Sequence, residues 1–107
     1  MFKISKKEAI HHGREGVDGY YYQLPNVQDG TTIAYAEFTG EHGQRTIGNR
    51  ARVYYILEGD AEFEINGNKF TAAATDLVTI PAGATYNLWP KTNTLKVLLV
   101  MELINFN

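Results

Sequence analysis

The chain of 107 residues contains no cysteine. Disulfide bridges and zinc sites built from cysteine are therefore excluded. Long apolar runs are also missing, because the longest, residues 97–101, is far shorter than the roughly 20 residues of a membrane-spanning helix. The first residues lack the apolar core of a signal peptide. We expect a cytoplasmic protein without a membrane segment.

The chain also lacks an excess of positive charge. Ten Lys and Arg stand against 12 Asp and Glu, which gives a net charge of −2. A nucleic-acid partner is therefore not expected, because such proteins need cations to neutralise phosphates. The composition, 44% apolar and 21% charged, is that of an ordinary globular protein, and the length predicts a single domain over residues 1–107.

Short runs rich in Tyr, Ile, Val, Thr and Phe, separated by Gly, Asn, Asp and Pro, predict an all-β chain. Asn66-Gly67 between two such runs favours a tight hairpin, because both residues tolerate positive φ. Before the strands, the Ser5-x-x-Glu8 spacing is typical of a capping box and predicts a short helix over about residues 6–11. The predicted strands cover about residues 20–23, 31–38, 44–47, 52–57, 61–65, 69–72, 77–80, 85–89 and 95–103.

Two segments suggest contact with a second subunit. The predicted strand 95–103 is apolar on both faces from residue 97 to residue 101, so both faces need cover, either from a second sheet of the same chain or from a partner. Tyr20, Tyr21 and Tyr22 form an aromatic cluster in which the first and third share a face. Edge-strand packing and a subunit interface both explain this cluster, and we expect a homodimer.

Two spaced segments resemble the signature motifs of the cupin family. The first runs from Gly40 to Gly59 with the family spacing, and the second contains Pro81-Ala82-Gly83. The resemblance covers about residues 31–101. It implies a small cupin of the RmlC-like type: a double-stranded β-helix, or jelly-roll barrel, over about residues 31–103, preceded by an N-terminal arm over residues 1–30, usually dimeric and with an internal pocket.

The family's metal-ligand positions are substituted in this chain. Thr46 and Gly48 stand where the two histidines of the first motif belong, Arg52 where the glutamate belongs, and Tyr86 where the histidine of the second motif belongs. A guanidinium repels a cation, and the other groups are poor ligands for a transition metal. We therefore expect neither a metal nor another cofactor.

Arg52 shares a strand face with Tyr54 and Ile56, and the cupin resemblance implies that this face points into the barrel. A buried guanidinium needs partners. One interpretation gives it an internal carboxylate such as Glu37, which would plug the vacated metal site. The other gives it a small anionic ligand, with Arg50 and Arg45 near the mouth and phenols from Tyr54 and Tyr86. The candidate ligand-binding residues are Arg52, Tyr54, Tyr86, Arg50, Thr46 and Glu37.

Three functions are compatible with this pocket. The favoured one is a metal-free protein that binds a small anionic ligand such as a sugar derivative or an organic acid. A metal-independent isomerase or epimerase would need an inward acid and base, for which Tyr86 and Glu37 are the candidates. A structural or regulatory dimer would need only a plugged barrel. The three histidines, His11, His12 and His42, are predicted to lie in loops at the surface.

Overall fold

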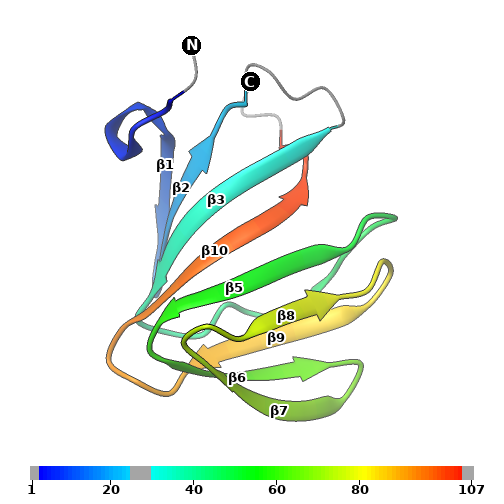
Figure 1. Cartoon of the computed structure of the whole chain (residues 1–107). Helices are drawn as coiled ribbons and strands as arrows, with labels where there is room; N and C mark the ends of the chain where they lie inside the picture. Colours follow the sequence, from blue (N-terminus) through cyan, green and yellow to red (C-terminus); the bar gives the residue numbers. More distant parts are fainter. Residues whose placement is uncertain (1–2, 25–29, 105–107) are drawn as a thin grey trace.

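The computed structural model describes residues 3–24 and 30–104, which form two antiparallel sheets (Figure 1). The larger sheet has the order β1-β2-β3-β10-β5-β8, and the smaller has the order β4-β9-β6-β7. Buried side chains from both sheets form one core. The strands are β1 (Ile10–Arg14), β2 (Val17–Tyr22), β3 (Thr31–Phe38), β4 (Arg45–Thr46), β5 (Arg52–Glu58), β6 (Asp60–Ile65), β7 (Asn68–Ala73), β8 (Leu77–Ile80), β9 (Thr85–Pro90) and β10 (Leu95–Glu102).

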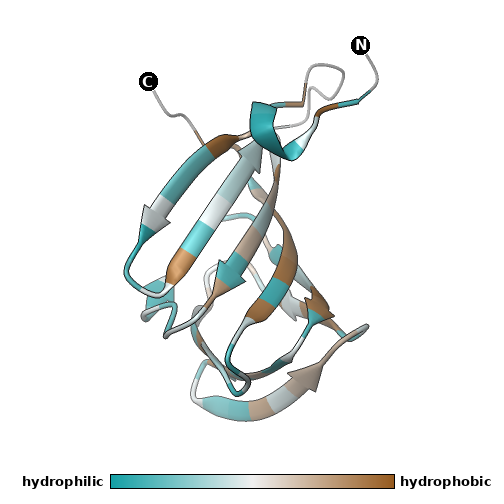
Figure 2. Ribbon diagram, turned by 90° about the vertical axis from the view of Figure 1, so that its left-hand side faces the viewer, coloured by the Kyte–Doolittle hydropathy of each residue, from teal (hydrophilic) through white to brown (hydrophobic). Residues whose placement is uncertain are grey.

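The N-terminal helix is shorter than predicted. A single 3-10 turn, η1 (Lys6–Glu8), follows Ser5, whose backbone N–H and hydroxyl both donate to the Glu8 carboxylate at 2.9 and 2.7 Å. Residues 10 and 11, predicted as helix, begin strand β1, which forms a hairpin with β2. The capping signal is therefore real, but pairing with β2 overrides a longer helix. In Figure 2 this turn is hydrophilic on the visible side. Within the described residues, no helix is long and apolar enough to cross a membrane.

Two turns that join consecutive strands depend on positive φ. Asn66 and Gly67, with φ of 49° and 84°, connect β6 to β7 as the sequence predicted. Gly59, with φ of 90°, lies between β5 and β6. A Cβ at this position would come within 2.6 Å of the Thr94 carbonyl oxygen. Glycine is therefore required at the final position of the first motif.

Strand β5 carries the predicted alternation. Arg52, Tyr54 and Ile56 are all buried, with exposed fractions of 3%, 0% and 0%. Val53 and Tyr55 face the other side and are half-buried. The prediction that Arg52 points into the core with Tyr54 is confirmed.

Strand β10 lies in the middle of the larger sheet, between β3 and β5. Four of its residues point into the core between the sheets, so one of its two apolar faces is covered by the chain itself. Leu98 and Val100 lie on the opposite face and are half-buried. On β2, Tyr21 packs against the core, as the predicted alternation of the tyrosine cluster requires.

Candidate functional site

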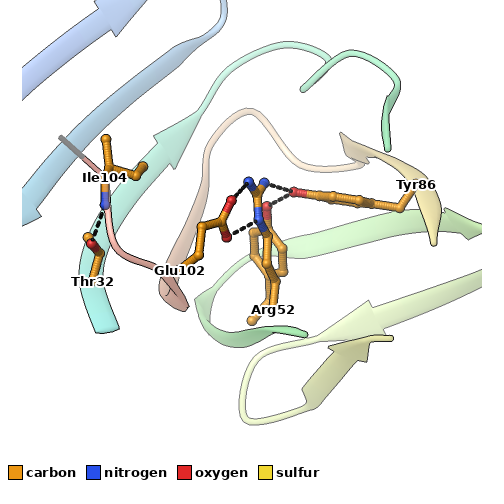
Figure 3. Close-up of polar contacts among 6 residues, drawn as sticks. Thr32, Arg52, Tyr86, Glu102 and Ile104 are labelled. Carbon is orange, nitrogen blue, oxygen red and sulfur yellow. Dashed lines mark hydrogen bonds and ion pairs between the residues drawn. The ribbon is translucent and has the colours of Figure 1, made fainter. Parts of the chain in front are cut away.

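Arg52 and Glu102 form an ion pair at one end of the space between the sheets (Figure 3). The Arg52 Nε donates to Glu102 Oε1 at 3.1 Å, and Nη2 donates to Oε2 at 2.7 Å. The two residues come from β5 and from the last position of β10. Two parallel bonds of this kind fix the orientation of the guanidinium plane. Bonding to Arg52 lowers the pKa of Glu102 despite its partial burial.

The remaining edge of the guanidinium binds two phenols in a chain. Arg52 Nη1 donates to the Tyr86 hydroxyl at 3.0 Å, and the Tyr54 and Tyr86 hydroxyl oxygens are 2.5 Å apart. Burial lowers the pKa of Arg52, but its bonds to Glu102 and Tyr86 outweigh that effect and raise it. Burial, together with Tyr86, raises the pKa of Tyr54. The result is a charged donor with two hydrogen-bonded hydroxyl groups in front of it.

His42, between β3 and β4, lies against this network. Its ring stacks on the ring of Tyr86, with centroids 5.2 Å apart and an interplanar angle of 30°. The Nδ1 atom is 2.7 Å from the Gly43 carbonyl oxygen. Because a carbonyl can only accept, Nδ1 carries the proton, and the neutral ring holds its lone pair on Nε2. His42 lies in a loop, as predicted, but it is half-buried against Tyr86 and not fully exposed.

The environment of His42 keeps its ring neutral. Burial, followed by the charges of Arg14, Arg52 and Arg45, lowers its pKa from 6.5 to about 4 despite the bond to Gly43. Within the described residues, Nε2 has no hydrogen-bond partner in the protein. At neutral pH this atom is therefore available to accept a proton.

The segment that carries His42 is held by β9. The His42 N–H donates to the Leu88 carbonyl at 2.9 Å, and the Gly43 N–H donates to Asn87 Oδ1 at 2.9 Å. The Asn87 amide in turn donates to Glu41 at 2.6 Å. The same strand supplies Tyr86, so one element positions both rings of the stacked pair.

Two adjoining cavities lie beside these groups. The Tyr54 cavity has a volume of about 340 Å³ and includes Tyr54 and Phe38 in its wall. The Arg45 cavity has a volume of about 360 Å³ and includes Arg45 and Arg52. Each is within the size range of small-molecule sites. Both are lined by Arg14, Tyr21, His42, Leu99 and Ile104.

The partner of Arg52 is not Glu37, as the sequence suggested. Glu37 lies on the outer face of β3, where the alternation that buries Ala36 and Phe38 turns it away from the core. Its carboxylate accepts from the Tyr35 hydroxyl at 2.8 Å and lies 3.7 Å from the Lys6 ammonium. Arg52 does pair with a carboxylate, but the residue is Glu102, whose side chain is 36% exposed and not internal. Glu37 is therefore also removed as a candidate base.

Two other candidate residues lie outside the walls of both cavities. Arg50 donates to the Gly30 carbonyl at 2.8 Å and to the Thr31 hydroxyl at 2.5 Å. Thr46 is exposed, and its hydroxyl bonds to that of Thr85 at 2.6 Å. The structure therefore brings together Arg52, Tyr54 and Tyr86 but does not add Arg50 or Thr46 to them.

The residues at the family's metal positions do not fit a metal ion. Arg52 is a cation whose donors are used by Glu102 and Tyr86, and Thr46 is at the surface. Elsewhere in residues 3–24 and 30–104, no three His, Asp or Glu side chains gather in a way that could hold one.

Comparison with solved structures shows the same architecture in other proteins. A variant of Streptomyces PAC13 with uridine superposes with a TM-score of 0.81 and 23% identity, over 99% of this chain and 86% of that one. The Schizosaccharomyces pombe Cnp3 cupin domain superposes with a TM-score of 0.79 and 12% identity, over 96% and 74%. The chain has the cupin fold. Neither the family models nor the curated proteins compared with the chain match it.

Two further solved structures share this fold. Pac13 is described as a nucleoside dehydratase and superposes with a TM-score of 0.80 and 24% identity, over 98% of this chain and 85% of that one. KdgF from Halomonas superposes with a TM-score of 0.79 and 12% identity, over 95% and 93%. At these identities the cupin fold is what the chain shares with them.

Sequence reasoning missed three residues of this site. His42 lies beyond Gly40 in a loop with no periodic pattern. Arg14 lies in a glycine-rich segment that was predicted to end a helix. Glu102 carried a usable signal, because it is a lone carboxylate at the end of an otherwise apolar strand.

Proposed function

We propose that the chain is a metal-independent acid–base enzyme that acts on a small sugar derivative, nucleoside or organic acid in the Tyr54 and Arg45 cavities. The observation that carries this proposal is His42. A neutral imidazole with an unoccupied Nε2 lines both cavities and stacks on a tyrosine of a hydrogen-bonded chain. A base next to a donor is the arrangement that proton transfer requires.

In the proposed mechanism His42 is the base. Its Nε2 takes a proton from a carbon made acidic by a neighbouring carbonyl of the substrate. Tyr54, whose side chain lines the Tyr54 cavity, gives its hydroxyl proton either to a leaving hydroxyl, which departs as water, or back to carbon on the other face. The first outcome is an elimination and the second an isomerisation. The proton on His42 then returns to the tyrosine pair through solvent.

Arg52 serves as a positioning residue in this mechanism. Its guanidinium donates to Tyr86, which shares a short bond with Tyr54. Negative charge that develops on the phenols when a proton leaves is therefore stabilised by a fixed cation. Glu102 keeps that cation in place through two bonds.

Two further observations support an enzyme over a plugged structural module. Cavities of about 340 and 360 Å³ lie beside the Arg52 network and leave room for a small ligand. Structures of PAC13 with uridine include one histidine-to-glutamine and two tyrosine-to-phenylalanine variants. Those are the residue types that meet beside the cavities of this chain.

The test is deuterium exchange, which needs no net turnover. Keto and aldehyde forms of sugars, nucleosides and hydroxy acids are incubated with the protein in D2O and followed by mass spectrometry. We expect incorporation at the carbon next to the carbonyl of one compound class. His42→Gln should slow it by about 100-fold or more, because general bases contribute roughly that much.

His11→Gln is the matched control for this experiment. His11 lies on β1, where its Nε2 contacts Asp18 at 3.0 Å, and it does not line either cavity. This variant should exchange deuterium at the wild-type rate, whereas Tyr54→Phe should be slower. Exchange that is absent for every class, or equal in the His42 and His11 variants, would contradict the proposal.

A further inference from the structure

Arg52, the cation expected to bind an anionic ligand, already uses three of its five N–H donors within the protein. Its Nε and Nη2 atoms bind Glu102 and its Nη1 atom binds Tyr86. The charge of Arg52 is compensated by Glu102, so most of the attraction for an anion in this cavity must come from other groups.

Arg45 is such a group. It lies on β4 directly opposite Tyr86 of β9, and its exposed side chain lines the Arg45 cavity. Among the described residues, no carboxylate or carbonyl binds its guanidinium. Its forked donors are thus available to a ligand, and a fork of this kind matches the oxygens of a phosphate or carboxylate.

Arg14 reaches the same cavity from the other sheet. It ends β1, lines both cavities and donates through Nη2 to the His42 carbonyl at 2.6 Å. That bond holds the side chain in place and leaves its other donors without protein partners in the described chain. Arg14 and Arg45 therefore face one cavity from two different strands. The Arg14 side chain is already held in place by its bond to the His42 carbonyl.

The charge of this cavity has the opposite sign to that of the chain. The whole chain carries a net charge of −2, yet the wall of the Arg45 cavity contains Arg14, Arg45 and Arg52 and, among the described residues, no acidic one. Glu102 forms its ion pair with Arg52, and the charge of Arg45 also acts on its carboxylate. Two positive charges are left in a concave site, where walls of low dielectric constant concentrate their field.

We propose that Arg14 and Arg45 form an anion subsite, so that the molecule processed beside His42 carries a phosphate or a carboxylate. This inference rests on the proposed function, since it assigns the substrate class of the same site. The anion would also neutralise two of the charges that lower the pKa of His42. Binding therefore makes His42 a stronger base only when the correct substrate is present.

The test compares three probes that differ in one group: uridine, its 5′-monophosphate and its 5′-carboxylic acid. Isothermal titration calorimetry at low ionic strength should show one of the charged probes binding at least about tenfold more tightly than uridine. The preferred probe identifies the anion as phosphate or carboxylate. Raising the salt concentration should reduce this preference, because salt screens charges near the surface.

Variants connect that preference to the two arginines. Arg45→Gln and Arg14→Gln should each remove most of it, and Arg45→Lys should retain part, since the charge remains without the fork. Lys91→Gln is the matched control, because Lys91 follows the opposite end of β9 and lines neither cavity. This variant removes the same charge and should keep the wild-type preference.

NMR titration of the His42 ring in the wild-type protein provides a second test. It does not depend on binding by the variants. The preferred probe should raise the pKa of the His42 ring, and uridine should not. The subsite is overturned if the three probes bind equally, if none shows saturable binding, or if the preference survives both arginine-to-glutamine changes. These calorimetric results need no turnover. If the wild-type protein shows no preference among the three probes but still exchanges deuterium through His42, the subsite is overturned and the proposed function stands.

Discussion

Glu102 holds Arg52 by two bonds, but the two partners differ in their exposure to water. The exposed fraction is 3% for the Arg52 side chain and 36% for that of Glu102. The carboxylate can therefore be solvated without its partner, whereas the guanidinium cannot. Because of this asymmetry, we expect substitutions of the two residues to destabilise the fold to different extents.

We predict that removing the carboxylate destabilises the fold more than removing the cation. Glu102→Ala leaves a buried guanidinium with only Tyr86, which should lower the free energy of unfolding by about 3 kcal/mol. Arg52→Met leaves a hydrated carboxylate and fills the space with apolar atoms, so a loss of roughly 1 to 2 kcal/mol is expected. Urea denaturation measures both.

Glu58→Ala is the control for this pair of variants. Glu58 lies 3.5 Å from the Lys96 ammonium, and its side chain is 63% exposed. Its loss should cost less than about 1 kcal/mol. An Arg52→Met variant less stable than Glu102→Ala would show that the guanidinium, and not the carboxylate, supports the fold.

We predict that stability declines with acid in a window set by His42. The fold keeps this ring neutral down to about pH 4, whereas the ring is protonated near 6.5 in the unfolded chain. The unfolded state therefore binds more protons between these values, and the free energy of unfolding falls as the pH drops from about 6.5 to about 4. The fall is at most about 3 kcal/mol.

Two comparisons show whether the pH dependence of stability comes from His42. His42→Gln should flatten the profile in that window, whereas His11→Gln should not change it. Glu102 contributes separately: bonding to Arg52 lowers its pKa, so its contribution is lost only at more acid pH, below the ordinary range of a glutamate. If the free energy of unfolding of the His42 variant still fell with the same slope between about pH 6.5 and pH 4, another group would be responsible for the decline.

We predict a homodimer formed through the outer face of the larger sheet. Leu98 and Val100 lie on this face, on the central strand, and are half-buried. Leu99 points inward and is 7% exposed, so Leu99→Asp would disrupt the core. Leu98→Asp should instead weaken the dimer while the circular dichroism of the fold is retained. Light scattering that gives a 12 kDa particle at micromolar concentration would refute the dimer.

We predict that the purified protein carries no stoichiometric transition metal. Arg52 and Thr46 replace ligands of the family's metal site, and a guanidinium at a ligand position repels a cation. Elemental analysis should find well under one nickel, iron, zinc or manganese per chain. About one metal per chain, lost on substitution of Arg52 or Tyr86, would contradict this prediction.

Alternation along strands is the part of this structure that the sequence predicts well. Arg52 and Tyr54 point inward because a strand has a period of two, and the turn at Asn66-Gly67 forms because both residues accept positive φ. Such signals are local. Strand β1 was missed because its two histidines and its glycine are poor strand residues, and pairing with β2 alone makes it a strand.

The site itself depends on contacts that no local pattern encodes. Glu102 is 50 residues from Arg52, and only the register of β10 beside β5 brings them together. His42 has no periodic neighbour that would predict its burial, since its position comes from backbone bonds to β9. The loops and strand ends that supply a site are therefore the least predictable part of it.

The bonding of the His42 loop to β9 has a consequence for how the proposed substrate would enter. Tyr86 belongs to the smaller sheet, to which the backbone of His42 is bonded, whereas Arg52, Tyr54 and Glu102 belong to the larger sheet. If the two sheets breathe apart to admit a molecule, the spacing between His42 and Tyr86 is preserved. The hydroxyl contact between Tyr54 and Tyr86 spans the seam and re-forms only on closure. The opening that admits the substrate would then separate Tyr54 from Tyr86, and the closing that follows would reassemble the proton donor.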